Sequence, residues 1–281
     1  MSGLLAIELG FSGEIFHAYI VPFLCLIACG WQIQALAEHD SRIIGGILAS
    51  LLVLCLPAMI VYGRTAYLEA LATGGLVLVF RIALKHLEYG KLRRKDAIAI
   101  GVIASLLGAV KYPYLYLVIF LPTAFFFWGK SKENLGYLVL SWGLVQSPFL
   151  ISDLLQHGSP FASYNTQATG AVNSLVGDYG EYGASQFFAD ISGEIGWLLF
   201  ISILFCSILW ANMGSGERWP AIFSVVFPSI LIFSIVLDFG YPRYHLPWLS
   251  VLICLACNWL SCNLESASIR KKIDNGALFS I

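Results

Sequence analysis

Three short segments of the sequence each place one cation among aromatic residues, a combination that can bind a phosphate group. The segments are 62–69 (YGRTAYLE), 111–114 (KYPY) and 241–245 (YPRYH). Their cations are Arg64, Lys111 and Arg243, and the side chains of Arg and Lys pair readily with phosphate oxygens. The sequence therefore offers three candidate sites for an anionic group, although a single cation with aromatics is also typical of an anchor at a membrane interface.

Other residues of these segments could touch a substrate. Glu69 could orient or deprotonate an acceptor hydroxyl, pair with Arg64, or act as a favourable charge at a helix N-terminus. The further candidates for substrate contacts are Tyr67, Tyr112, Tyr244 and His245. A histidine in such a place is as typical of helix capping or packing as of substrate binding.

The polar segment 153–194 is rich in carboxylates and aromatics and contains no Lys or Arg. It could form a platform for a sugar, or a solvated cap over the helices. Cys254 and Cys257 form a CxxC inside an apolar stretch, which we interpret as small core residues rather than a metal or redox site. Neither a metal-binding spacing nor a Gly-rich phosphate loop is present, so no cofactor is expected; a divalent metal ion stays open.

The elements that must position these residues are membrane helices. Hydrophobic residues make up 58% of the 281 residues, charged residues only 12%, and the mean hydropathy is +0.79. The formal net charge of −1 leaves no basic face for nucleic acid. The composition therefore predicts an all-α, polytopic transmembrane bundle forming a single domain over residues 1–281.

Apolar runs between charged residues predict about nine membrane segments with one long loop. They are expected near 16–37, 43–62, 67–88, 97–110, 113–128, 135–152, 195–212, 220–238 and 244–261.

The basic residues predict how these helices are oriented. Most of them, including the cluster at 91–95 and the C-terminal tail at about 262–281, fall on one side if the chain turns back at Pro113. This side is cytoplasmic under the positive-inside rule. The long acidic loop is then external, that is, periplasmic, extracellular or lumenal, and Arg64, Lys111 and Arg243 are the only cations beside it.

At these motifs the chain resembles the polytopic GT-C glycosyltransferases, the superfamily of dolichyl-phosphate-mannose protein mannosyltransferases and bacterial lipid-A aminoarabinose transferases. The resemblance covers about residues 24–260 and rests on Pro57 with 62–69, on LLGAVKYP at 106–113, and on RYHLP at 243–247. It implies transfer of a hexosyl or pentosyl group from a polyprenyl-phosphate or diphosphate carrier to a lipid, glycan or protein on the external face. Lys111 and Arg243 would then hold the carrier phosphate, and Glu69 would lie near the acceptor.

The resemblance also implies a catalytic carboxylate in a first external loop, and the sequence begins about where that loop would end. Glu8 and Glu14 are the only carboxylates before residue 20. Two alternatives therefore stay open besides a glycosyltransferase: a transporter or flippase of a lipid-linked substrate, and a truncated, non-catalytic membrane subunit. Membrane lipids are expected partners in all three cases.

Overall fold

The structure is a computed structural model of the whole chain. It describes residues 20–39, 43–62, 69–110, 112–129, 132–163, 165–166, 189, 191–193, 195–213, 218–232 and 242–277. The described residues form helices and no strand, which confirms the predicted all-α class.

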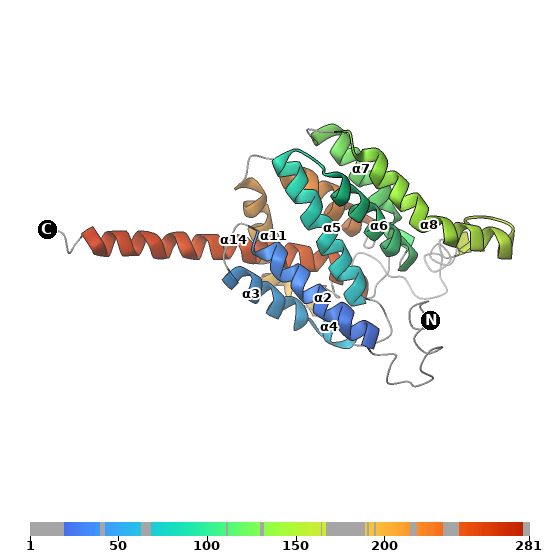
Figure 1. Cartoon of the computed structure of the whole chain (residues 1–281). Coiled ribbons are helices and arrows are strands. Elements are labelled where there is room, and N and C mark those ends of the chain that lie inside the picture. Colours follow the sequence, from blue (N-terminus) through green and yellow to red (C-terminus); the bar gives the residue numbers. More distant parts are fainter. Residues whose placement is uncertain are drawn as a thin grey trace.

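The first three long helices pack closely against one another. Helix α2 (Ile20–Ala37) lies against α3 (Ile43–Leu54) and α5 (Glu69–Tyr89) (Figure 1). Gly74 permits the contact with α2, because a Cβ atom at this position would lie 3.0 Å from the Cα atom of Cys29. A larger residue at this position would force α2 and α5 apart.

The prediction of a single helix at 43–62 was wrong, because this segment forms two helices. The chain leaves the helical conformation after Leu54 and resumes as α4 (Pro57–Tyr62). Proline disfavours the helical conformation in the residue before it and lacks an N–H group, but it is well suited to the first position of a helix. Pro57 therefore ends one helix and begins the next.

The predicted turn at Pro113 is confirmed as a hairpin. Helix α6 (Arg94–Val110) is followed by the 3₁₀ helix η2 (Tyr112–Tyr116) and by α7 (Leu117–Trp128). Asn134, just beyond α7, donates a hydrogen bond from Nδ2 to the carbonyl oxygen of Leu92, just before α6, at 2.7 Å. Asn134 directly precedes the next helix along the chain, so this bond connects the start of α6 to the start of that helix.

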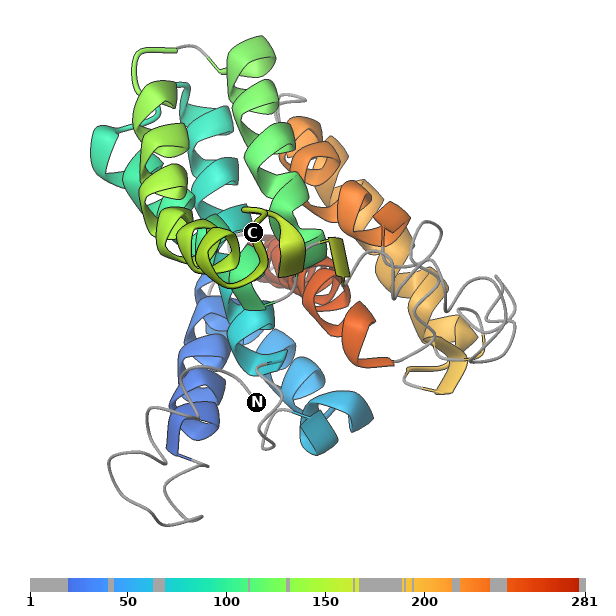
Figure 2. The same cartoon turned by 90° about the vertical axis from the view of Figure 1, so that its right-hand side faces the viewer.

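Helix α8 (Leu135–His157) packs along α6, with α7 beside both of them (green in Figure 2). Gly101 allows this contact, because a Cβ atom there would overlap Ser141 Oγ and the Leu138 carbonyl group. Inside the contact Ser105 donates a hydrogen bond to Gln146 Oε1 at 2.9 Å. The helix runs past its predicted end at 152, so the loop predicted at 153–194 begins later.

Helix α8 stops where Gly158 adopts a left-handed backbone conformation, with φ of 72°. Most of the remaining loop, including residues 167–188, lies outside the described residues. Its predicted role as a sugar platform or a cap therefore stays a prediction.

The next apolar segments form α11 (Trp197–Asn212) and a composite helix. The composite helix consists of α12 (Arg218–Ala221), the π-helical turn η4 (Ile222–Val226) and α13 (Phe227–Leu231). It covers most of the helix predicted at 220–238.

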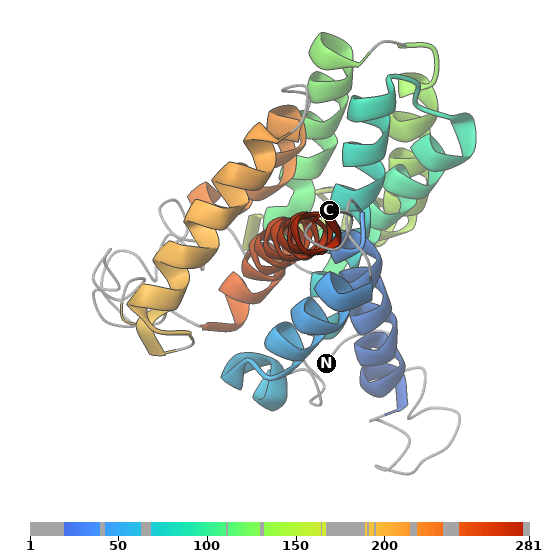
Figure 3. The same cartoon turned by 90° about the vertical axis from the view of Figure 1, so that its left-hand side faces the viewer.

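Helix α14 (Pro242–Ala277) runs through the middle of the bundle and continues beyond it (Figures 1 and 3). It contacts α2, α3, α5 and α11, and its apolar side chains are almost wholly buried from Leu246 to Cys257. The prediction that the helix ends near 261 was wrong, because the helix extends through most of the predicted tail.

Among the described residues, three helices are long and apolar enough to cross a membrane: Glu69–Glu88, Leu135–His157 and Tyr244–Leu264. Five other apolar helices of the described chain are shorter, so the predicted count of nine spans is not confirmed. Large apolar side chains face outward across the bundle, among them Trp31, Phe127 and Leu198 at 70%, 70% and 85% exposure. Apolar outer faces of this kind and the three long helices indicate a membrane protein.

Candidate functional site

Glu69 is the first residue of α5, and its side chain is only 2% exposed. A carboxylate at this position interacts favourably with the N-terminal end of the helix dipole. Burial of a carboxylate is costly unless nearby groups compensate its charge or donate hydrogen bonds to it. The structure therefore places this candidate residue inside the protein, where its surroundings decide its chemistry.

One buried tyrosine from another part of the chain lies near this carboxylate. Tyr114, in η2, is fully buried and lies within electrostatic range of Glu69, Tyr116 and Tyr244. Tyr244 belongs to the first turn of α14. Glu69 at the start of α5 and Tyr244 at the start of α14 therefore both lie within electrostatic range of Tyr114, at the turn of the α6–α7 hairpin.

Tyr116 holds η2 in this position. Its hydroxyl group donates to the carbonyl oxygen of Val225 at 2.8 Å and also contacts Ser229 Oγ, which connects η2 to η4 and α13. The rings of Tyr114 and Tyr116 lie 6.3 Å apart. Tyr116 therefore helps to position Tyr114, while its own hydroxyl group is hydrogen-bonded to Val225 and Ser229.

Two further buried polar residues lie on the same helices as Glu69 and Tyr244: Thr73 on α5 and His245 on α14. His245 is 1% exposed and packs edge-to-face against Trp248, with ring centroids 5.6 Å apart. Thr73 lies one helical turn after Glu69, is fully buried, and its hydroxyl has no hydrogen-bond partner among the described residues. We use the name Glu69 cluster for Glu69, Thr73, Tyr114, Tyr116 and Tyr244.

The structure thus places two of the predicted site residues, Glu69 and Tyr244, within electrostatic range of the same residue, Tyr114, and His245 follows Tyr244 in the chain. The side chains of the other five predicted site residues lie outside the described part of the structure. Arg64, Tyr67 and Lys111 lie outside the described residues, and so does the side chain of Tyr112.

The same holds for the side chain of Arg243, although its backbone lies in the first turn of α14. Binding of a donor phosphate by Arg64, Lys111 and Arg243 therefore stays a prediction.

Sequence analysis missed Thr73, Tyr114 and Tyr116 as site residues, although Tyr114 lies in the motif at 111–114. Tyr116 had a visible signal, because 112, 114 and 116 are all tyrosines around a proline. Thr73 had none, since a threonine in an apolar helix is common.

A second polar cluster lies at the other end of α5, about 30 Å away along a helix of 21 residues. Glu88 accepts hydrogen bonds from Arg218 Nε at 2.7 Å and is paired with His39 Nε2 at 2.8 Å. Arg218 also donates to the Trp210 carbonyl oxygen and lies over the Trp210 ring. These contacts connect the end of α5 to α11, to α12 and to the residues that follow α2.

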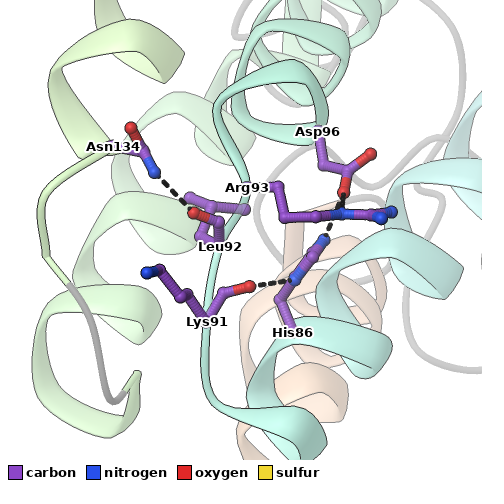
Figure 4. Close-up of polar contacts among 6 residues, drawn as sticks. All are labelled: His86, Lys91, Leu92, Arg93, Asp96 and Asn134. Atoms are coloured by element: carbon purple, nitrogen blue, oxygen red, sulfur yellow. Dashed lines mark hydrogen bonds and ion pairs between the residues drawn. The ribbon is translucent and has the colours of Figure 1, made fainter.

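Asp96 forms a similar set of contacts at the start of α6 (Figure 4). It accepts from Arg93 Nε at 2.7 Å and pairs with His86 Nε2 at 2.9 Å, while His86 Nδ1 lies 2.6 Å from the Lys91 carbonyl oxygen. Burial raises the pKa of Asp96, but the hydrogen bonds and positive charges of Arg93 and His86 outweigh it and hold the pKa below its ordinary value. We use the name basic-end cluster for His39, His86, Glu88, Asp96 and Arg218.

The two clusters differ in what they can do. In the basic-end cluster each carboxylate already has two basic partners, which is typical of a structural role. In the Glu69 cluster a buried carboxylate lies within electrostatic range of Tyr114, whose phenol group can donate or accept hydrogen bonds. No three His, Cys, Asp or Glu side chains of the described chain come together where they could hold a metal ion.

Comparison of the chain with protein-family models, with curated proteins and with solved structures gave no match.

Proposed function

We propose that this protein is a membrane glycosyltransferase that moves a sugar from a polyprenyl-phosphate-linked donor to a lipid, glycan or protein acceptor on the non-cytoplasmic face. The observation that carries the proposal is the buried carboxylate of Glu69 within electrostatic range of Tyr114, which also lies within range of Tyr244. The motif at 62–69, which ends in Glu69, and the motif at 241–245, which contains Tyr244, support the proposal from the sequence.

In the proposed reaction an acceptor hydroxyl attacks the anomeric carbon of the donor sugar. A new C–O bond forms as the bond between the anomeric carbon and the phosphate oxygen breaks, and the phosphate leaves with the electron pair. Glu69 takes the proton of the acceptor hydroxyl, while Lys111 and Arg243 neutralise the departing phosphate. Tyr114 and Tyr244 orient the acceptor by hydrogen bonds from their hydroxyl groups.

The lipid part of such a donor needs an apolar surface at the same end of the bundle. An apolar cleft of about 280 Å³ lies between the α3–α4 junction, the start of α11 and α14. Its walls include Pro57, Leu199 and Ile253. We propose that the part of the isoprenoid chain nearest the phosphate packs in this cleft.

The test is turnover by the Glu69→Gln variant, in which the amide keeps the size of the carboxylate but cannot take a proton. We expect transfer to fall by about 10²- to 10⁴-fold, the range typical of a lost general base. The matched control is Glu133→Gln, because Glu133 is an exposed carboxylate at the other end of the hairpin. Wild-type turnover in a Glu69→Gln variant that inserts normally would contradict the assignment of Glu69 as the base.

A further inference from the structure

A polar cleft of about 470 Å³ lies between α2, α5 and the start of α6, at the end of the bundle opposite Glu69. The polar residues that line it are His39, Arg81, Lys85, His86, Arg93 and Asp96. Three of these residues, His39, His86 and Asp96, belong to the basic-end cluster. The lining has more cationic side chains than anionic ones.

The carboxylates around this cleft are already engaged. Asp96 is paired with His86 and Arg93, and Glu88 is paired with His39 and Arg218.

Within the described part of the chain, no carboxylate pairs with Arg81 or Lys85. Arg81 is half-buried in the membrane-spanning helix α5, two turns before its end. A cation in such a place is costly without a compensating anion, so the cleft is suited to a negatively charged group.

An apolar groove of about 400 Å³ continues the cleft along the same three helices. Leu78 lines both the cleft and the groove. Leu24 and Leu106, on the groove wall, are 57% and 45% exposed, so the groove borders the surface that faces lipid. Gly74 and Gly75 leave the floor without side chains. An extended hydrocarbon chain fits these features.

Gln32 lies on the groove wall, and its side-chain oxygen is buried without a hydrogen-bond partner among the described residues. Rotation of the amide by half a turn would present its N–H group instead. A carbonyl group inside the groove, such as the ester of a lipid, would then satisfy this amide. Gln32 therefore provides a polar group in the otherwise apolar groove that adjoins the basic cleft.

From this order of surfaces we infer that the cleft and the groove form a single binding site for an anionic glycerophospholipid. The phosphate lies against Arg81 and Lys85, an ester carbonyl accepts a hydrogen bond from Gln32, and an acyl chain fills the groove. Basic pockets between membrane helices bind anionic lipid head groups through this kind of electrostatic complementarity. The basic cleft lies at the opposite end of α5 from Glu69, although the groove extends along α5 as far as Ala70, and the site does not depend on the reaction proposed at Glu69.

The first experiment compares lipids. The full-length protein, purified in detergent and freed of lipid, is titrated with dioleoyl phosphatidylglycerol or with dioleoyl phosphatidylcholine, and bound lipid is counted by native mass spectrometry. We expect phosphatidylglycerol to bind about tenfold more tightly, since each basic residue near a lipid phosphate contributes about 1 kcal/mol. Equal affinity for the two lipids would overturn the proposal.

The second experiment tests the residues that should hold the phosphate. Arg81→Gln/Lys85→Gln should weaken phosphatidylglycerol binding about tenfold or more. Lys95→Gln/Lys132→Gln removes two exposed cations from the same end and should leave binding unchanged. Equal losses in the two double variants would mean a general charge effect and would overturn the assigned site.

The third experiment tests the acyl chain. Ala28→Phe fills the groove from its exposed side and should also weaken binding about tenfold, whereas Ala109→Phe, on an exposed face of α6 outside the groove, should not. If Ala28→Phe has no effect while inorganic phosphate displaces the lipid, the cleft is a site for a small anion and the proposed lipid site is wrong. Thermal unfolding of each variant separates lost binding from lost folding.

Discussion

Glu88 and Arg218 lie 130 residues apart in the sequence and are joined by a hydrogen bond of 2.7 Å between Oε1 and Nε. Arg218 is 8% exposed, and its guanidinium group also lies 4.3 Å from the centre of the Trp210 ring. The pair connects the end of α5 to the start of α12. A buried ion pair therefore connects helices that are far apart in the sequence at this end of the bundle.

We expect Arg218→Gln to lower the free energy of unfolding by about 3 kcal/mol, because it leaves a largely buried carboxylate with one basic partner instead of two. The measurement is thermal or denaturant unfolding in detergent. Arg93→Gln is the control, since Arg93 is half exposed and its pair with Asp96 should contribute less than about 1 kcal/mol.

The double variant Glu88→Gln/Arg218→Gln should be more stable than Arg218→Gln alone, because it also removes the buried negative charge that had lost its arginine partner. Equal losses in Arg218→Gln and Arg93→Gln would contradict the structural role of the buried pair.

Gly101 should be intolerant of even a methyl group. Gly101→Ala would push the new Cβ atom into Ser141 Oγ and the Leu138 carbonyl group, so α6 and α8 must separate. We expect a loss of about 1–3 kcal/mol in the free energy of unfolding, as is typical of overpacking. Gly143→Ala is the control, because no atom lies within 4 Å of a Cβ atom at that position in α8. If both variants unfold alike, the close contact between α6 and α8 is wrong.

Asp96 should make stability depend on pH in a defined direction. Its pKa is lower in the folded protein than in the unfolded chain, so the ionised carboxylate stabilises the fold. This contribution is fully present above the ordinary pKa of about 4 and is lost as the pH falls through the lower folded value. We expect Asp96→Asn to lower the melting temperature at pH 7.

The difference between the wild type and Asp96→Asn should shrink below about pH 3. Melting curves recorded from pH 7 to pH 2.5 measure it. Glu133→Gln, which changes an exposed carboxylate, should show no comparable difference at any pH. A gap between the wild type and Asp96→Asn that is constant or grows on acidification would show that Asp96 does not act through its charge.

Local signals in the sequence predicted much of the fold. Pro113 marked the hairpin between α6 and α7, and apolar runs between charged residues marked α2, α5, α6, α8 and α11 within a few residues. The break before Pro57 was missed, because an apolar run on both sides of a proline looks like one helix. The extension of α14 to Ala277 was missed because its last turns are polar, and hydropathy indicates where lipid ends rather than where a helix ends.

The candidate site was predicted only in part. Glu69 and Tyr244 were recognised because each lies in a motif with a cation and aromatics. The position of both residues near Tyr114 was not predicted, because it depends on how the starts of α5, η2 and α14 pack together. The pairing of Glu88 with Arg218 and of His86 with Asp96 could not be predicted either, since nothing local selects a partner across 130 or 10 residues.

The most direct test of the proposed function follows the label of a donor in proteoliposomes that contain the wild-type protein. The donors are polyprenyl-phosphate-linked tritiated mannose and aminoarabinose, offered with a lipid and glycan extract as acceptor. We expect the label to leave the polyprenyl phosphate and to appear in an acceptor product, in proportion to the amount of protein. Movement of the intact labelled donor across the membrane, with no cleavage of its sugar–phosphate bond, would contradict a glycosyltransferase and indicate a transporter.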